Sequence, residues 1–282
     1  MNVLTLSRGW SSQRYNGFSL IEVAVVLTIL TVLLFGISVP LTAQVESRRL
    51  DDTRKQLEQA NLAILGFVSA YGRFPCPASN TSNGLESFCT SATGACTPTT
   101  NIQTHGRCSN FYDGFLPSST LGLTPLDGSG FWRDAWGSIN NRVRYAVREL
   151  TFTVGTTTYS RVLTTTDAAN DMKAATMANI IGVGASPRDL LSVCKDGAAV
   201  TGFDCNNVPN TLTTQAPAVV FSLGPNASTT GGTSIHESKN IDGNQVFIFR
   251  DREAGAGEFD DVVSWLSLYT VFNRLIEVGR LP

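Results

Sequence analysis

Residues 17–23 read GFSLIEV and open an apolar run that continues to Leu41 with one charge, Glu22. As a helix rising about 1.5 Å per residue, the run from Phe18 to Leu41 covers roughly 36 Å, more than the ~30 Å hydrocarbon core of a bilayer. Backbone groups in lipid must pair within the chain, so we predict a membrane helix. A carboxylate near the start of such a helix is costly, and we expect Glu22 to have a functional partner.

The residues before this run are basic. Arg8 and Arg14 occur without an acid in residues 1–17, a flank that the positive-inside rule keeps in the cytoplasm. Two other interpretations stay open: a plain signal anchor, and a secretory signal peptide cut after Ala43. The apolar run is longer than the usual signal-peptide core of about 7–15 residues and contains Glu22, which argues against the signal peptide.

This region resembles the processing signature of type IV prepilins and type II secretion pseudopilins. The shared features are a basic leader, a glycine, an aromatic residue, a glutamate and a long apolar run in fixed order, over residues 14–45. The resemblance implies that the prepilin peptidase cuts between Gly17 and Phe18 and then N-methylates Phe18. It also implies that Glu22 pairs with the free amine of a neighbouring pilin or pseudopilin in a helical filament.

The helix is predicted to continue past the apolar run. Pro40 removes a helical hydrogen bond, so we predict a kink around it; family members often place this proline slightly earlier. Between residues 42 and 72, apolar residues such as Leu57, Ile64 and Val68 recur at helical spacing, and charged residues fill the opposite face. A glycine and a proline then end the pattern, which predicts one long helix that supports a folded domain.

These patterns, with the resemblance, predict four parts: a prepilin leader at 1–17, a transmembrane or filament-core helix at 18–41, its amphipathic half at 42–72, and a periplasmic globular domain at 73–282. The expected fold is α+β and type IV pilin-like, with the long helix packed on an antiparallel sheet and disulfide-clipped loops. The resemblance implies a single-pass protein of the bacterial inner membrane with a cytoplasmic N-terminus, later extracted into a periplasmic or surface filament.

Composition and cysteine content narrow the functional class. The chain has 282 residues and a formal net charge of −2, which argues against a strongly basic nucleic-acid binder. All six cysteines follow the apolar run, and an even number outside the cytoplasm is typical of disulfides. A zinc site using His105 is the alternative, disfavoured because no C-x-x-C pair occurs. The favoured pairs are Cys89 with Cys96, Cys76 with Cys108, and Cys194 with Cys205.

The later part of the chain shows mainly strand signals. Val143, Tyr145 and Val147 alternate with arginines, as in a half-buried strand. Residues 224–243 are polar and without periodicity, which predicts a mobile loop. Further predicted elements are a hairpin of 151–154 with 158–162, strands at 178–183, 218–223, 245–250 and 262–266, and a helix at 268–278.

An aromatic cluster and an acidic cluster are candidate binding features. Phe131, Trp132 and Trp136 are compatible with a sugar or peptide platform, but core packing is favoured. Some pseudopilins hold calcium in a loop near the position that the acidic cluster takes in this chain, and calcium prefers several oxygen ligands. The acids lack EF-hand spacing, so a solvated loop is favoured over calcium, and no other cofactor is expected. The acids are Asp251, Glu253, Glu258, Asp260 and Asp261.

No catalytic motif is present, and we expect a protein without enzymatic activity. The two histidines, His105 and His236, lie in predicted loops, and no nucleophile elbow, H-E-x-x-H or phosphate-binding loop occurs. The predicted function is a minor pilin or pseudopilin of a pilus or type II secretion-like filament. The expected partners are the prepilin peptidase, other pilins or pseudopilins and the inner membrane. The alternative is a membrane-anchored periplasmic binding or adhesive protein that does not polymerise.

Overall fold

The computed structural model describes residues 17–165, 172, 190–228, 234–252 and 259–281, with the backbone alone for residues 35–43. The described chain is α+β and contains three disulfides. It divides into two compact units, Met1–Arg48 and Arg49–Pro282. The second unit includes the long helix from Arg49 onward, so it combines most of the predicted amphipathic half-helix with the predicted globular domain.

Helix α1 (Leu20–Tyr71) begins in the first unit. The backbone N–H groups of Glu22 and Val23 donate to the Ser19 carbonyl and start its first turn. Large apolar side chains from Phe18 to Leu34 are all exposed, from 45% for Val23 to 88% for Leu20. Within this unit, therefore, the described part of the helix buries none of its large apolar side chains.

Among residues whose side chains are described, no helix is both long enough and apolar enough to cross a membrane. Part of the predicted span at 18–41 falls in residues 35–43, whose side chains lie outside the description. The backbone is helical through Pro40, and the predicted kink there stays a prediction.

In the second unit, α1 buries one face. Leu57, Ala60, Ile64 and Val68 are 0–1% exposed and lie in the main core cluster, which confirms the amphipathic pattern. The helix ends where the Gly72 N–H donates to the Val68 carbonyl and Gly72 takes a left-handed φ of 67°. Glycine adopts this conformation without a Cβ penalty, as in many helix C-termini.

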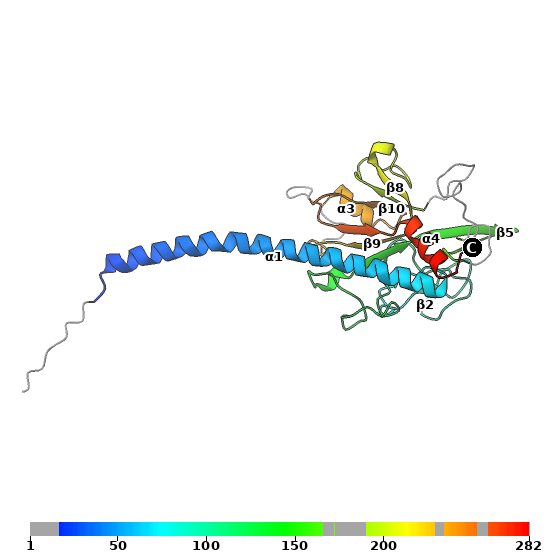
Figure 1. The fold of residues 1–282 in the computed structure, drawn as a ribbon, viewed down its shortest axis with the longest axis horizontal. Coiled ribbons are helices and arrows are strands. Elements are labelled where there is room, and N and C mark those ends of the chain that lie inside the picture. The colour runs from blue at the N-terminus through cyan, green and yellow to red at the C-terminus, as the bar shows by residue number, and fades with distance from the viewer. Residues whose placement is uncertain (1–16, 166–171, 173–189, 229–233, 253–258, 282) are drawn as a thin grey trace, which may run out of the picture. The chain divides into compact units, whose positions relative to one another are not determined.

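The strands form several small sheets (Figure 1). One sheet has the order β11-β9-β4-β3 with antiparallel neighbours, and another has the order β10-β7-β8 with β10 and β7 parallel. The bounds are β3 Gly114–Phe115, β4 Arg144–Val147, β7 Leu191–Cys194, β8 Thr211–Ala216, β9 Ala218–Ser222, β10 Val246–Ile248 and β11 Val262–Trp265. Two further pairs are β1 (Phe88–Cys89) with β2 (Pro98–Thr99), and β5 (Glu149–Val154) with β6 (Thr157–Val162). The antiparallel β-structure that the sequence predicts is therefore present, but it is divided among several sheets, and one pair of strands, β7 with β10, is parallel.

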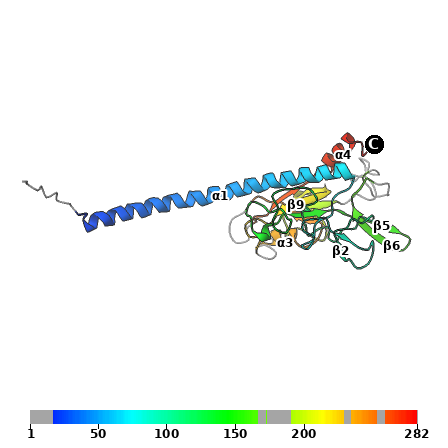
Figure 2. The same ribbon diagram turned by 90° about the horizontal axis from the view of Figure 1, so that it is seen from below.

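The four-stranded sheet is buried on both faces. Tyr145 and Val147 of β4 share a core cluster with α1, whereas Ala146 and Phe221 share a second cluster with Phe247 of β10. Figure 2 shows the second half of α1 running along the sheet that contains β9. Because successive side chains of a strand point to opposite faces, β4 and β9 pack on the helix with one set and on the three-stranded sheet with the other.

Several predicted elements are confirmed and others are corrected. The hairpin β5–β6, the strands β9, β10 and β11, and helix α4 (Leu268–Glu277) lie where predicted. The loop predicted at 224–243 is wrong for residues 235–240, which form helix α3 (Ile235–Asn240) with Ser234 as its N-cap. Strands β7 and β8 were not predicted. The predicted strand at 178–183 lies outside the described residues.

Candidate functional site

The predicted processing segment lies at the start of α1. Gly17 and Phe18 precede the helix without regular structure and are exposed, Phe18 to 82%. Glu22 is exposed in the first helical turn, where the partial positive charge of the helix N-terminus favours a carboxylate. The peptide bond after Gly17 is therefore accessible within this unit, and Glu22 follows it by about one helical turn.

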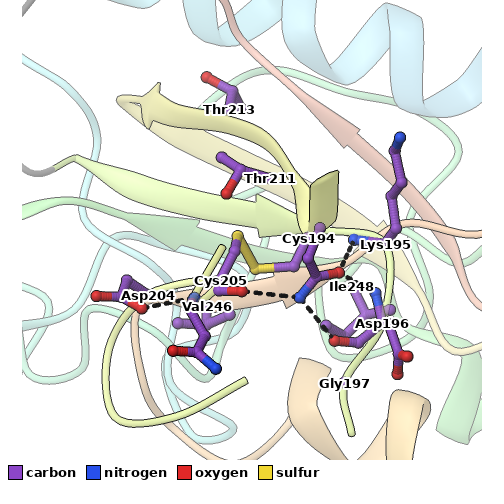
Figure 3. The surroundings of a disulfide bond; sticks show 12 residues. Cys194, Lys195, Asp196, Gly197, Asp204, Cys205, Thr211, Thr213, Val246 and Ile248 are labelled. Atoms are coloured by element: carbon purple, nitrogen blue, oxygen red, sulfur yellow. Dashed lines mark hydrogen bonds between the residues drawn. A yellow bond between two sulfur atoms is a disulfide. The ribbon is translucent and has the colours of Figure 1, made fainter. Parts of the chain in front are cut away.

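The disulfide between Cys194 and Cys205 closes a loop at the end of β7 (Figure 3). Asn210 is 6% exposed and holds this loop from inside. Its Oδ1 accepts from the N–H groups of Lys195 (3.1 Å) and Asp196 (2.7 Å), and its Nδ2 donates to the carbonyls of Asp196 (3.1 Å) and Cys205 (2.9 Å). The disulfide and this amide together restrain the loop.

The other disulfides restrain the long irregular stretch after α1. They join Cys76 to Cys108 and Cys89 to Cys96, and all three pairs in the structure are those that the sequence favoured. No cysteine is free, so the zinc alternative has no thiolate ligand. Arg73 and Glu86 add an ion pair of 2.6 Å to this region, and the Glu86 carboxylate also accepts from the Cys76 N–H at 2.7 Å.

The acidic cluster is only partly a surface loop. Asp251 is exposed, as a solvated loop requires, and Glu253 and Glu258 lie outside the described residues. Asp260 and Asp261 are instead buried, 2% and 7% exposed, so the solvated-loop interpretation is wrong for them. The reason is that these two residues lead directly into the buried strand β11.

Glu237 of α3 joins the two buried aspartates. It is 1% exposed, and carboxylate oxygens of Glu237, Asp260 and Asp261 lie within 4.8 Å of one another. Glu237 is not among the predicted site residues, because it lies in the segment that the sequence predicts to be a loop. The signal was a capping box: Ser234 and Glu237 are three residues apart, and each bonds the other's backbone N–H.

Hydrogen bonds hold this group of carboxyls in place. A Glu237 oxygen accepts from the Asp260 N–H at 3.0 Å, and Asp261 accepts from the Asn240 amide at 2.7 Å. Burial raises the pKa of Asp261 well above its ordinary value, and the nearby charges of Glu237 and Asp260 raise it further. In proteins, buried carboxyl groups at such short distances share a proton or ligate a cation. The chemistry of these three side chains is compatible with either arrangement.

The aromatic segment lies in the core, as favoured from the sequence. Phe131 and Trp132 are 1% and 3% exposed. The following Asp134 is 4% exposed and accepts from the side chains of Ser222 and Asn141. Burial raises the pKa of Asp134 despite these hydrogen bonds. The segment therefore ties β9 to the loop before β4 through a buried carboxyl.

The two histidines have structural contacts. His105 Nδ1 accepts from the Arg107 N–H at 3.1 Å. His236 lies in α3 and not in a loop, and its Nδ1 accepts from the Gly197 N–H at 3.0 Å. Backbone donors to ring nitrogens fix the orientation of both rings, which is typical of a structural histidine.

Comparison with known proteins identifies the N-terminal segment. Residues 12–38 match the family model described as the prokaryotic N-terminal methylation motif, the prepilin-type signature. The matched residues include the glycine, the aromatic residue and the glutamate of the candidate processing segment. Comparisons with curated proteins and with solved structures find no match.

Proposed function

We propose that this chain, which carries the prepilin-type signature, is a minor pilin or pseudopilin, a structural subunit of a type IV pilus or a type II secretion-like filament. The observation that carries the proposal is the methylation motif at residues 12–38. The exposed apolar side chains from Phe18 to Leu34 support it, because such a surface is stable in water only when lipid or other helices cover it.

Maturation would follow the motif. The prepilin peptidase cuts after Gly17, removes the basic leader, and methylates the amine of Phe18. Before assembly the helix is held in the bacterial inner membrane, with the leader in the cytoplasm and the disulfide-bonded domain in the periplasm. The three disulfides support the oxidising compartment on that side.

Glu22 would then set the register of assembly. An unpaired charge within an apolar helix bundle costs several kcal/mol, so a carboxylate that meets the amine of a neighbouring subunit favours one axial position. The position of Glu22 in the first turn, close to the cut, supports this role. The large disulfide-bonded domain favours a minor subunit over the main building block.

The test combines processing with incorporation into filaments. Intact mass and N-terminal sequencing of protein from its native membrane should show a chain that begins at N-methylated Phe18. Glu22→Ala should be processed normally but lost from sheared filaments, whereas the control Glu58→Ala, at an exposed position of the same helix, should be incorporated normally.

Each contrary result has a defined meaning. A chain that begins at Gln44 identifies a secreted protein and rejects the filament role. A processed chain that never appears in sheared filaments supports the alternative, a membrane-anchored periplasmic binding or adhesive protein. Normal incorporation of Glu22→Ala rejects the pairing role of the carboxylate.

A further inference from the structure

The first four cysteines of the chain are paired in a nested order. Cys89 is bonded to Cys96, and both lie within the segment that the disulfide between Cys76 and Cys108 closes. Cys76 is therefore bonded not to the next cysteine along the chain but to the third one after it. Joining these cysteines in the order in which they occur would instead give Cys76 with Cys89 and Cys96 with Cys108, which we call the sequential order.

The statistics of the unfolded chain do not select the nested order. Its two disulfides close loops of 7 and 32 residues, whereas those of the sequential order would close loops of 13 and 12 residues. The probability of closing a flexible loop falls with about the 3/2 power of its length, so the two orders differ by less than about twofold, in favour of the sequential one. The folded structure therefore selects the nested order.

The fold fixes the nested order and then shields it. Cys76 and Cys108 lie in the main core cluster, 0% and 2% exposed, and Cys89 is 1% exposed. The Glu86 carboxylate accepts from the Cys76 N–H at 2.7 Å, and Phe88 forms an isolated β-bridge with Cys108. Because thiol–disulfide exchange needs access to a sulfur atom, any correction of the pairing has to precede the closure of this core.

We propose that this protein is a substrate of a thiol–disulfide isomerase, which acts on the chain before the second unit folds. The inference rests on export of the domain into an oxidising compartment, as in the proposed function, and not on filament assembly. At a synthesis rate of roughly 5–20 residues per second, Cys76 and Cys89 are exported together roughly a second before Cys96 follows, whereas a loop of about ten residues closes in about 10–100 ns. A thiol oxidant of that compartment therefore meets the sequential pair first.

The partner has to supply a thiolate, because the sequential order, with Cys194 bonded to Cys205, uses all six cysteines. The isomerase thiolate attacks the Cys89 sulfur, forms a mixed disulfide and releases the Cys76 thiolate. This thiolate attacks the Cys108 sulfur, forms the Cys76–Cys108 bond and releases the Cys96 thiolate. The Cys96 thiolate attacks the Cys89 sulfur of the mixed disulfide, forms the Cys89–Cys96 bond and returns the isomerase thiolate. Two disulfides are present before and after the exchange, so no electrons are gained or lost.

The test maps the disulfides of the full chain, produced in a bacterial host with or without its periplasmic disulfide isomerase. Free thiols are alkylated, and cleavage after Arg and Glu then gives peptides 74–86, 87–107 and 108–133. Nested pairs link the first peptide to the third and leave the second alone with an internal disulfide, whereas sequential pairs link all three. We expect the ratio of the three-peptide species to the two-peptide species to rise at least tenfold in the host without the isomerase.

The control variant carries Cys89→Ser and Cys96→Ser, so that its cysteines are all paired with neighbours in chain order. Its link between Cys76 and Cys108 should form equally in both hosts. Because degradation in the cell can remove wrongly paired chains, the same digest is applied to purified full chain that is reduced, oxidised in urea and then diluted into detergent. At least about two-thirds of these chains should be wrongly paired. Reduced isomerase should convert them to the nested order, and its active-site serine variant should not.

Three results overturn the inference. The first is an equal amount of nested chain in both hosts, which shows that the fold corrects the order without help and leaves the proposed function intact. The second is purified chain that reaches the nested order as fast without the isomerase as with it. The third is a chain whose cysteines stay reduced in both hosts, which also rejects the exported topology of the proposed function.

Discussion

Replacement of Asp127 by asparagine tests how a buried carboxylate stabilises the loop before β4. The Asp127 side chain is 2% exposed. Burial alone raises its pKa, but hydrogen bonds from the N–H groups of Phe131 and Ser129 and from Arg142 outweigh that effect and lower the pKa from 3.8 to about 2. The folded state therefore stabilises the ionised form of Asp127 relative to the unfolded chain.

The size and sign of the effect follow from this pKa. A carboxyl group whose pKa is lowered in the folded state stabilises the fold at pH values above its unfolded pKa. This stabilisation is lost as the pH falls through the folded pKa. For Asp127 this amounts to about 2 kcal/mol of unfolding free energy at pH 7, and to roughly 1 kcal/mol at pH 3. Asparagine removes the charge and places an N–H₂ group against the two arginines. The free energy of unfolding of Asp127→Asn should therefore be lower than that of the parent by at least the carboxylate's contribution.

The assay is urea unfolding of the full chain, followed by tryptophan fluorescence at pH 7 and pH 3. The difference between the parent and Asp127→Asn should shrink by about half over this range. Asp51→Asn is the control, since Asp51 pairs with Arg54 at 3.7 Å with both side chains 58% exposed, and it should change stability by less than about 0.5 kcal/mol. A difference that stays constant between the two pH values, or is below about 0.5 kcal/mol at pH 7, refutes the reasoning.

Three further predictions concern the second unit. Replacing Cys194 and Cys205 by serine should cost about 3 kcal/mol in guanidinium unfolding under oxidising conditions, and an unchanged midpoint would contradict a stabilising role for this disulfide. Burial raises the folded pKa of Asp261, so its protonated form contributes stability at low pH that is lost as pH rises above about 4. Asp261→Asn should therefore flatten the alkaline side of the profile of unfolding midpoint against pH. If calcium added at neutral pH instead raises the parent's midpoint, the result favours a cation among these carboxyls. Gly224→Ala should cost more than about 2 kcal/mol in the same unfolding assay, because φ is +63° and a Cβ would lie 2.4 Å from the Asp260 carbonyl oxygen; a stability equal to the parent's would show that the loop shifts freely.

Features that depend on neighbouring residues were predictable from the sequence. The processing segment at 17–22 is a linear pattern, and the long helix follows from apolar residues spaced by one or two turns, such as Leu57, Ile64 and Val68. The hairpin β5–β6 needs only a glycine between two β-rich runs. The favoured disulfides also join cysteines near in sequence, 7, 11 and 32 residues apart.

Features that join distant segments were decided only by the tertiary structure. The parallel pairing of β7 with β10, the meeting of Glu237 with Asp260 and Asp261, and the approach of Gln56 to the loop that contains Trp132 all connect segments far apart along the chain. Each arises because apolar strands and one face of α1 are buried together, and the burial carries polar side chains with it. Local spacing determines which residues form a helix or a hairpin, but the packing of one core determines which polar groups meet inside it.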